Sequence, residues 1–140
     1  MNKNFFKNLN SRLCTLGYEK IKKVSEIKGG LNSKVYLLDL KKKKFVVKIY
    51  GDKSKSKIRR EKLFYNYLIK INNPHIINPL FFDVRKNFAL FPYISGKKIK
   101  KIQKKHLLEL LQFLNSINKK KKSKNLPLAV DGINDRNQHI

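Results

Sequence analysis

Residues 45–50, Phe-Val-Val-Lys-Ile-Tyr, are the stretch on which the fold prediction rests. Apart from its single lysine, the run consists of β-branched and aromatic residues, the types that are enriched in strands. Side chains alternate between the two faces of a strand, so Val47 and Ile49 are expected on the face opposite Lys48. A lysine within a buried strand needs an anion to offset its desolvation. The alternative is that Lys48 occupies the solvent face of a sheet.

Two further strand-like segments precede this run. Residues 23–28 and 34–40 are joined by the glycine-containing connection at 29–33, and a run of four lysines, Lys41 to Lys44, leads into the strand at 45–50. Short β-prone runs separated by turn-forming or charged residues predict an antiparallel meander. The four lysines are expected at a solvated hairpin tip.

A helix is expected to interrupt the strands after residue 50. Between residues 57 and 71 the apolar period is helical, with Phe64, Leu68 and Ile71 on one stripe. Residues 72–74, Asn-Asn-Pro, stop this helix because proline cannot continue it. Two short apolar runs follow, at 76–84 and 88–94, separated by a turn at 85–87.

The predicted fold class is therefore α+β, with a five-stranded antiparallel sheet, one inserted helix, a leading helix and a trailing helix. The leading helix spans residues 4–17, where Phe5, Leu9, Leu13 and Leu16 have helical spacing before Gly17. Leucines from Leu107 to Leu114, followed by Ile117, mark the trailing helix. We expect four parts: the N-terminal helix at 1–17, a lobe at 18–96, a linker and helix at 97–118, and a loop and truncated end at 119–140.

Composition indicates a folded and strongly basic chain. The 140 residues suit one domain, and 41% of them are hydrophobic, which argues against disorder. Lys and Arg number 34 against 9 Asp and Glu, a formal net charge of +25. Such a charge points to nucleic acid or an anionic membrane, or to an A/T codon bias that enriches Lys, Asn and Ile. We favour the bias because lysine predominates over arginine, whose planar fork binds phosphate bidentately.

Cysteine content and hydropathy indicate where in the cell the protein is expected. A single cysteine, Cys14, excludes an internal disulfide, and no apolar run approaches the ~18 residues of a membrane span. We expect a cytoplasmic protein with no transmembrane segment. Association of the basic N-terminal helix with a membrane surface is a further alternative.

Four motifs occur in a definite order along the chain. Residues 29–36 read Gly-Gly-Leu-Asn-Ser-Lys-Val-Tyr, residues 46–50 read Val-Val-Lys-Ile-Tyr, residues 59–61 read Arg-Arg-Glu ahead of Leu68, and residues 92–96 read Pro-Tyr-Ile-Ser-Gly. In this order they resemble the N-terminal lobe of the aminoglycoside phosphotransferase and choline kinase-like family, which has a protein-kinase-like fold. The resemblance covers residues 20–118.

The resemblance implies ATP as cofactor. Lys48 would contact its α- and β-phosphates, held in position by the carboxylate of Glu61. A hairpin of small residues would let backbone N–H groups approach the phosphate oxygens. The implied hairpin residues are Gly29, Gly30, Asn32 and Ser33. The alternatives are an ordinary hairpin turn, and a surface ion pair for Glu61.

The resemblance also implies a hinge that reads the adenine edge through the backbone. The candidates are the carbonyl of Pro92 and the N–H of Ile94. Pro92 stands where the family commonly has an acidic residue, and a proline carbonyl still accepts a hydrogen bond. The apolar slot for the adenine ring would be formed by Ile27, Val35, Val46 and Leu90, which also suit plain core packing.

No catalytic or metal-binding residue is assigned. In this fold the catalytic aspartate of an H-x-D-x-x-x-x-N loop and a second, Mg²⁺-binding aspartate belong to the C-terminal lobe. No such loop occurs in this sequence, so Mg²⁺ is expected only if the other lobe is supplied. His75, His106 and His139 share no metal-ligand spacing, and Cys14 has no nearby histidine to activate it.

The expected function is that of the nucleotide-binding lobe of an ATP-dependent phosphotransferase, a kinase, acting on a small-molecule hydroxyl. The chain is expected to be a fragment that is inactive alone, with the substrate chosen by the absent lobe; a stand-alone lobe with a non-catalytic role is the other possibility. The alternative class is a small basic nucleic-acid-binding protein whose lysines at 41–44, 97–105 and 119–124 contact phosphates.

Overall fold

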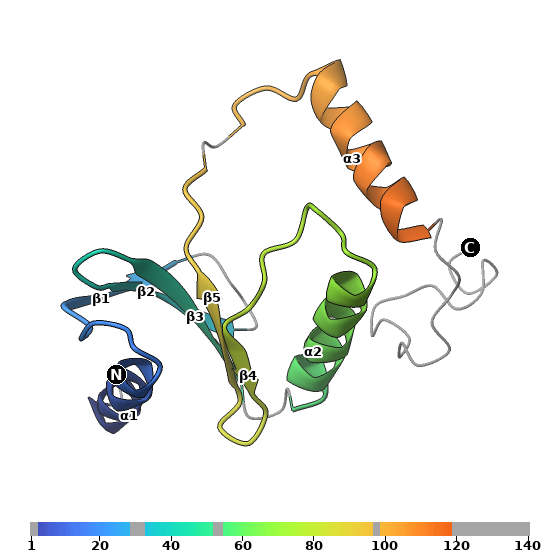
Figure 1. The fold of residues 1–140 in the computed structure, drawn as a ribbon. Coiled ribbons are helices and arrows are strands. Elements are labelled where there is room, and N and C mark those ends of the chain that lie inside the picture. Colours follow the sequence, from blue (N-terminus) through green and yellow to red (C-terminus); the bar gives the residue numbers. More distant parts are fainter. Residues whose placement is uncertain (1–2, 29–32, 52–54, 97–98, 119–140) are drawn as a thin grey trace.

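A computed structural model describes residues 3–28, 33–51, 55–96 and 99–118 of the chain. These ranges contain three helices and five strands (Figure 1). In chain order they are α1 (Lys3–Thr15), β1 (Lys23–Ile27), β2 (Ser33–Asp39), β3 (Lys44–Tyr50), α2 (Lys55–Lys70), β4 (Phe81–Asp83), β5 (Phe88–Pro92) and α3 (Lys104–Asn118).

The five strands form one antiparallel sheet in the order β1-β2-β3-β5-β4. The first three strands are the predicted meander, and α2 enters the chain between β3 and β4. The four-lysine run forms the exposed tip between β2 and β3, where Lys44 pairs with Asp39 at 3.0 Å. The α+β fold expected for a kinase-like N-terminal lobe is therefore confirmed.

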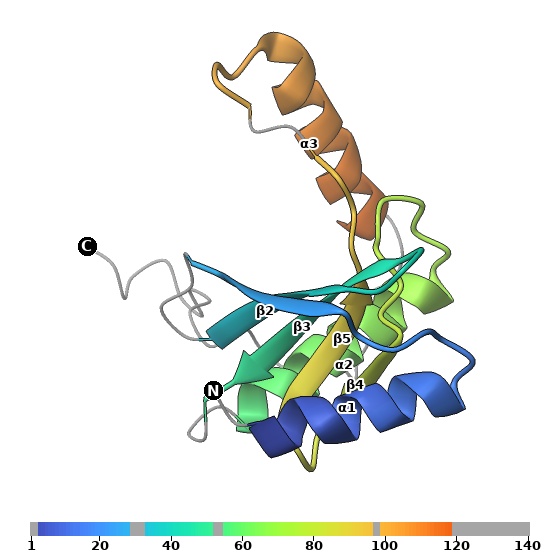
Figure 2. The ribbon, with the colours of Figure 1, turned by 90° about the vertical axis from the view of Figure 1, so that its left-hand side faces the viewer.

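One face of the sheet carries α1 and the larger apolar cluster. Figures 1 and 2 show α1 and α2 on opposite sides of the sheet. The α1 face is built from side chains of the helix that contact alternate residues of β2, β3 and β5, as a period of two requires. Its buried members are Phe6, Leu9, Leu13, Tyr36, Leu38, Leu40, Phe45, Val47, Phe88 and Leu90.

The other face of the sheet carries α2 and a smaller cluster. Its buried members are Tyr50, Ile58, Ala89 and Phe91, with Tyr65 and Phe82 among the half-buried side chains packed on them. Aromatic rings line this α2 face: Tyr65 lies 5.7 Å from Phe82 and 5.5 Å from Phe91, centroid to centroid. The two faces therefore differ in how much apolar surface they bury.

The third helix, α3, touches the rest of the protein mainly at its C-terminal end. The hydroxyl of Tyr67 donates to the carbonyl of Ile117 at 3.1 Å, and Asn73 Nδ2 donates to Ser116 Oγ at 2.9 Å. The leucines of α3 that mark it as amphipathic stay 43–54% exposed: Leu107, Leu108, Leu110, Leu111 and Leu114. The helix prediction is confirmed, while its apolar face has no cover among the described residues.

None of the described helices is long and apolar enough to span a membrane.

Several details of the predicted helices and strands are wrong. The strand expected at 76–84 is confined to Phe81–Asp83, because Pro79 lacks a backbone N–H and pairing begins beyond it. Leu16 lies past the end of α1 and is 51% exposed. On α2, Phe64 is 40% exposed, because the stripe that faces the sheet runs through Ile58 and Leu68 by way of Tyr65.

Candidate functional site

An ion pair between sheet and helix is the centre of the candidate site. Lys48 lies on the α2 face, beside Val35 of β2 and Ala89 of β5 in the register. Its Nζ contacts Glu61 Oε2 at 2.7 Å, and the two side chains are 32% and 25% exposed. The structure therefore shows the contact that the family resemblance implies, and Val47 and Ile49 pack on the opposite face, as strand alternation predicts.

Helix geometry explains why Glu61 reaches the sheet. Ile58, Tyr65 and Leu68 form the buried stripe of α2, and Glu61 lies within it, three residues after the first and four before the second. Residues at this spacing share one helix face. Glu61 is therefore the single charged group in an otherwise apolar stripe that faces Lys48.

Tyr50 lies directly beside this pair. Lys48 Nζ is 4.8 Å from the centroid of the Tyr50 ring, within the range of a cation–π interaction. The Tyr50 side chain is buried, and its hydroxyl makes no hydrogen bond to any residue that the structure describes. Leaving a hydroxyl buried without a partner costs about 1–3 kcal/mol. Tyr50 has no expected role in the sequence motif, although its place two residues after Lys48 puts it on the same face.

Burial and the charge of Glu61 act on two tyrosines at the site. Burial raises the pKa of Tyr50 far above its ordinary value, and the nearby carboxylate of Glu61 raises it further. The same two causes raise the pKa of Tyr65. Both hydroxyls therefore keep their protons at neutral pH and remain possible donors. The Tyr50 hydroxyl faces the Glu61 carboxylate without reaching hydrogen-bond geometry.

The backbone of Tyr50 is fixed by the turn between β4 and β5. The N–H of Tyr50 donates to the carbonyl of Asn87 at 2.9 Å, and Asn87 Nδ2 donates to the carbonyls of Tyr50 and Gly51, each at 2.9 Å. Asn87 has a φ of 58°, in the left-handed region that asparagine tolerates better than most residues. The sequence shows Asn87 only as a turn residue, because its side-chain contacts are long-range.

In the segment expected to act as the hinge, Pro92 ends β5. The N–H of Tyr93 donates to the carbonyl of Lys44 at 3.0 Å, which makes Pro92 and Phe45 a non-hydrogen-bonded pair. The carbonyl of Pro92 consequently points away from β3, and β4 pairs only with residues 88–90. Ile94 lies beyond the strand and is 59% exposed. Their role in binding adenine stays a prediction.

Three of the four residues expected to form the adenine slot lie on the α2 face with Lys48. Val35 is paired with Lys48, Ile27 is paired with Val35, and Val46 lies two residues before Lys48. The fourth, Leu90, is wrong: it alternates to the α1 face and is fully buried there. Phe91, which pairs with Val46, occupies the corresponding position on the α2 face.

The hairpin that is expected to cover the phosphates is only partly described. Gly29, Gly30 and Asn32 lie outside the described residues, so their expected contacts stay predictions. Ser33 begins β2 and pairs with Tyr50. The connection between β1 and β2 therefore starts and ends at the same end of the sheet as Tyr50 and Lys48.

The described histidines and the cysteine have ordinary surroundings in the structure. Groups of three or more His, Cys, Asp or Glu side chains that could hold a metal are absent from the part of the chain that the structure describes. His75 packs edge-on against Phe113 at 6.0 Å, and His106 Nδ1 accepts a hydrogen bond from the backbone of Gln103 at 3.1 Å. Cys14 is exposed, and His139 lies outside the described residues.

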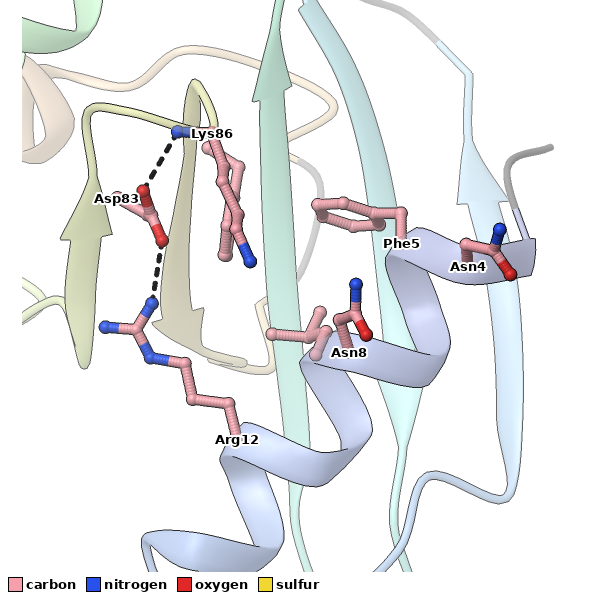
Figure 3. Close-up of a pocket in the computed structure, with 8 residues that line it drawn as sticks. Asn4, Phe5, Asn8, Arg12, Asp83 and Lys86 are labelled. Carbon is pink, nitrogen blue, oxygen red and sulfur yellow. Dashed lines mark hydrogen bonds and ion pairs between the residues drawn. The ribbon is translucent and has the colours of Figure 1, made fainter.

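A hollow of about 230 Å³ lies on the other side of the sheet, between α1 and the β4–β5 hairpin (Figure 3). Arg12 contacts Asp83 there at 2.8 Å and lies 3.8 Å from the centroid of the Phe81 ring. The second oxygen of Asp83 accepts from the backbone of Lys86 at 2.9 Å. Arg12 and Asp83 are therefore already paired with each other, and we assign no ligand to this hollow.

Comparison with known proteins identifies the fold. No protein-family model matches the sequence, and no curated protein matches it. Among solved structures, the gentamicin complex of APH(2")-IIa matches with a TM-score of 0.71 and 18% identity, over 99% of this chain and 46% of that one. The ADP-bound aminoglycoside phosphotransferase APH(2'')-Ib matches with a TM-score of 0.66 and 20% identity, over 88% and 42%. Choline kinase LicA from Streptococcus pneumoniae matches with a TM-score of 0.54 and 19% identity, over 67% and 32%.

These likenesses show an aminoglycoside phosphotransferase and choline kinase-like fold. The chain spans less than half the length of each of these proteins. Two further neighbours are a streptomycin–ATP complex of APH(2")-IIa and LicA in complex with AMP.

Proposed function

We propose that this chain is the nucleotide-binding lobe of an ATP-dependent phosphotransferase that acts on a small-molecule hydroxyl. The observation that carries the proposal is the 2.7 Å contact between Lys48 and Glu61, which bridges β3 and α2 in a chain with this fold. Among similar structures, complexes with ADP, ATP and AMP support a nucleotide as the ligand.

Different site residues would contact different parts of ATP. Lys48 would bind the α- and β-phosphates, and Glu61 would keep its ammonium directed toward them. The hairpin of Gly29, Gly30, Asn32 and Ser33 would cover the phosphates with backbone N–H groups. Pro92 and Ile94 would bind the adenine edge through their backbone. When bound, ATP supplies the phosphoryl group that is transferred.

The remaining parts of the reaction would come from a second lobe. We propose that residues 18–96 form the lobe proper, that residues 97–118 lead toward the second lobe, and that the chain is inactive by itself. That lobe would supply the catalytic aspartate, the Mg²⁺ ligands and the acceptor site. A cytoplasmic location, where ATP is abundant, suits this role.

The strand β3 offers a matched test. Lys48→Ala removes the site lysine, while Lys44→Ala removes an ion-paired lysine from the other end of the same strand, where its side chain is 55% exposed. ATP is titrated into each full-length chain, and the dissociation constant is followed by backbone amide shifts. We expect Lys48→Ala to weaken ATP binding at least about tenfold, as loss of a charge-assisted hydrogen bond requires. Lys44→Ala should leave the affinity within about twofold of the original chain.

Two results would contradict the proposal. One is a chain that binds no ATP at millimolar concentrations while its amide spectrum shows it to be folded. The other is an equal loss of affinity in both variants. If single-stranded RNA is bound and both variants weaken it equally, the nucleic-acid alternative is favoured instead.

A further inference from the structure

The hydroxyl of Tyr50 is a buried polar group at the candidate site whose contacts with the described residues do not explain it. The residue is 4% exposed, and its hydroxyl has no hydrogen-bond partner among the described residues. Buried polar groups are nearly always paired, so an exception at a site calls for a reason. Phenylalanine would fill the same space without leaving a donor unpaired.

Tyr50 lies beside both members of the central ion pair. Its ring lies 4.8 Å from the ammonium of Lys48, and its hydroxyl faces the carboxylate of Glu61. Lys48 occupies only one carboxylate oxygen of Glu61, Oε2. A carboxylate offers about four acceptor positions, so Glu61 has room for a second donor.

The position of Tyr50 is set by contacts on its other side. Its backbone N–H and C=O are both bonded to Asn87. Its side chain packs in the cluster that holds Ile58 of α2. Tyr50 is therefore a fixed point, and a new bond to Glu61 would form by a small adjustment of the glutamate or of α2.

A phosphate at the site would change the electrostatic surroundings of the Glu61 carboxylate. An anion that attracts the ammonium of Lys48 leaves the negative charge of Glu61 less well neutralised. The anion also brings a second negative charge close to Glu61. A partly buried carboxylate that loses its cation requires another donor. The Tyr50 hydroxyl lies beside it and has kept its proton.

We infer that Tyr50 is a positioning residue that donates a hydrogen bond to Glu61 when a nucleotide phosphate engages Lys48, and so holds α2 against the sheet in the bound state. This inference rests on the proposed nucleotide site. According to this inference, the Tyr50 hydroxyl gains its hydrogen bond only when nucleotide is bound. The hydroxyl should therefore lower the stability of the free protein and increase the affinity for the nucleotide.

The test compares Tyr50→Phe with Tyr36→Phe, which removes the hydroxyl of a buried tyrosine on the α1 face. Each full-length chain is unfolded in urea without ligand and titrated with ATP. We expect Tyr50→Phe to leave the urea midpoint unchanged or raised, while the ATP dissociation constant increases about tenfold. Tyr36→Phe should leave the dissociation constant within about twofold. In a Glu61→Gln background, Tyr50→Phe should weaken binding less, because the bond to a charged acceptor is already lost.

The inference is overturned if Tyr50→Phe binds ATP as the original chain does while Lys48→Ala does not. It is also overturned if Tyr50→Phe lowers the urea midpoint without changing the affinity, since the hydroxyl then has a purely structural role. If the original chain binds no ATP, the proposed function fails first and the inference fails with it.

Discussion

The two faces of the sheet differ in what they bury, although they share the same strands. In the described residues, the α1 face buries ten apolar side chains in one cluster, and the α2 face buries four. The α2 face also holds the Lys48–Glu61 pair and the hydroxyl of Tyr50, which has no hydrogen-bond partner among the described residues. Apolar burial is the main source of folding free energy, while buried polar groups oppose it unless paired. We conclude that the α1 face contributes most of the folding stability. The α2 face contributes less, because it contains charged and polar groups.

The largest effect is expected from a cavity on the α1 face. Leu13 is fully buried, and Leu13→Ala should lower the free energy of unfolding by about 3 kcal/mol. Urea unfolding followed by far-UV circular dichroism measures the loss. Leu16→Ala is the control, because Leu16 is 51% exposed just beyond the same helix, and it should change stability by at most about 0.5 kcal/mol.

The same variant sharpens the contrast between the faces. At a temperature where Leu13→Ala stays folded, its affinity for ATP should equal that of the original chain. A large loss of affinity in Leu13→Ala would show that the two faces are coupled, and the division of roles would fail.

A smaller effect is expected where a polar contact replaces apolar packing on the α2 face. Asn87→Ala removes both side-chain bonds to the end of β3 and places alanine at a φ of 58°. The combined cost should be about 2 kcal/mol. Asn87→Gly loses the same bonds but tolerates the backbone conformation, so it should cost about half as much. Equal urea midpoints for the two variants would contradict a conformational contribution.

The sequence predicted the part of this contrast that depends on local periodicity. Strand alternation around residues 45–50 correctly separates Lys48 from Val47 and Ile49. The partner of Lys48 came from the resemblance to a family, because no local pattern joins residues thirteen positions apart on different elements. Its contact with Glu61 is nevertheless present.

The errors arose where more than one periodic assignment was possible. On α2, apolar residues surround the helix, so Phe64 was placed in the stripe that Tyr65 occupies. On β5, every residue from Phe88 to Phe91 is apolar and buried, so the sequence could not show that Leu90 faces α1. The bond network of Asn87 and the burial of the Tyr50 hydroxyl depend on tertiary contacts and had no local signal.

The smallest expected effect is a dependence of stability on alkaline pH that originates on the α2 face. Burial and the charge of Glu61 raise the pKa of Tyr50 and of Tyr65 in the folded protein. In the unfolded chain a tyrosine ionises near pH ~10. Above that pH the unfolded chain has released a proton that the folded protein retains, so the free energy of unfolding falls as pH rises. Below it, both states keep the proton, and this contribution is constant.

Urea unfolding at pH 8 and pH 10.5 measures this dependence. Between these values Tyr50→Phe should reduce the loss of stability by about 1 kcal/mol relative to the original chain, because phenylalanine has no proton to release. Lysines also titrate in this range, and comparing variants at the same pH removes their shared contribution. Tyr36→Phe controls for loss of a tyrosine from the α1 face. If both variants flatten the pH dependence equally, the effect does not originate at the Lys48–Glu61 pair, and the electrostatic distinction between the two faces is wrong.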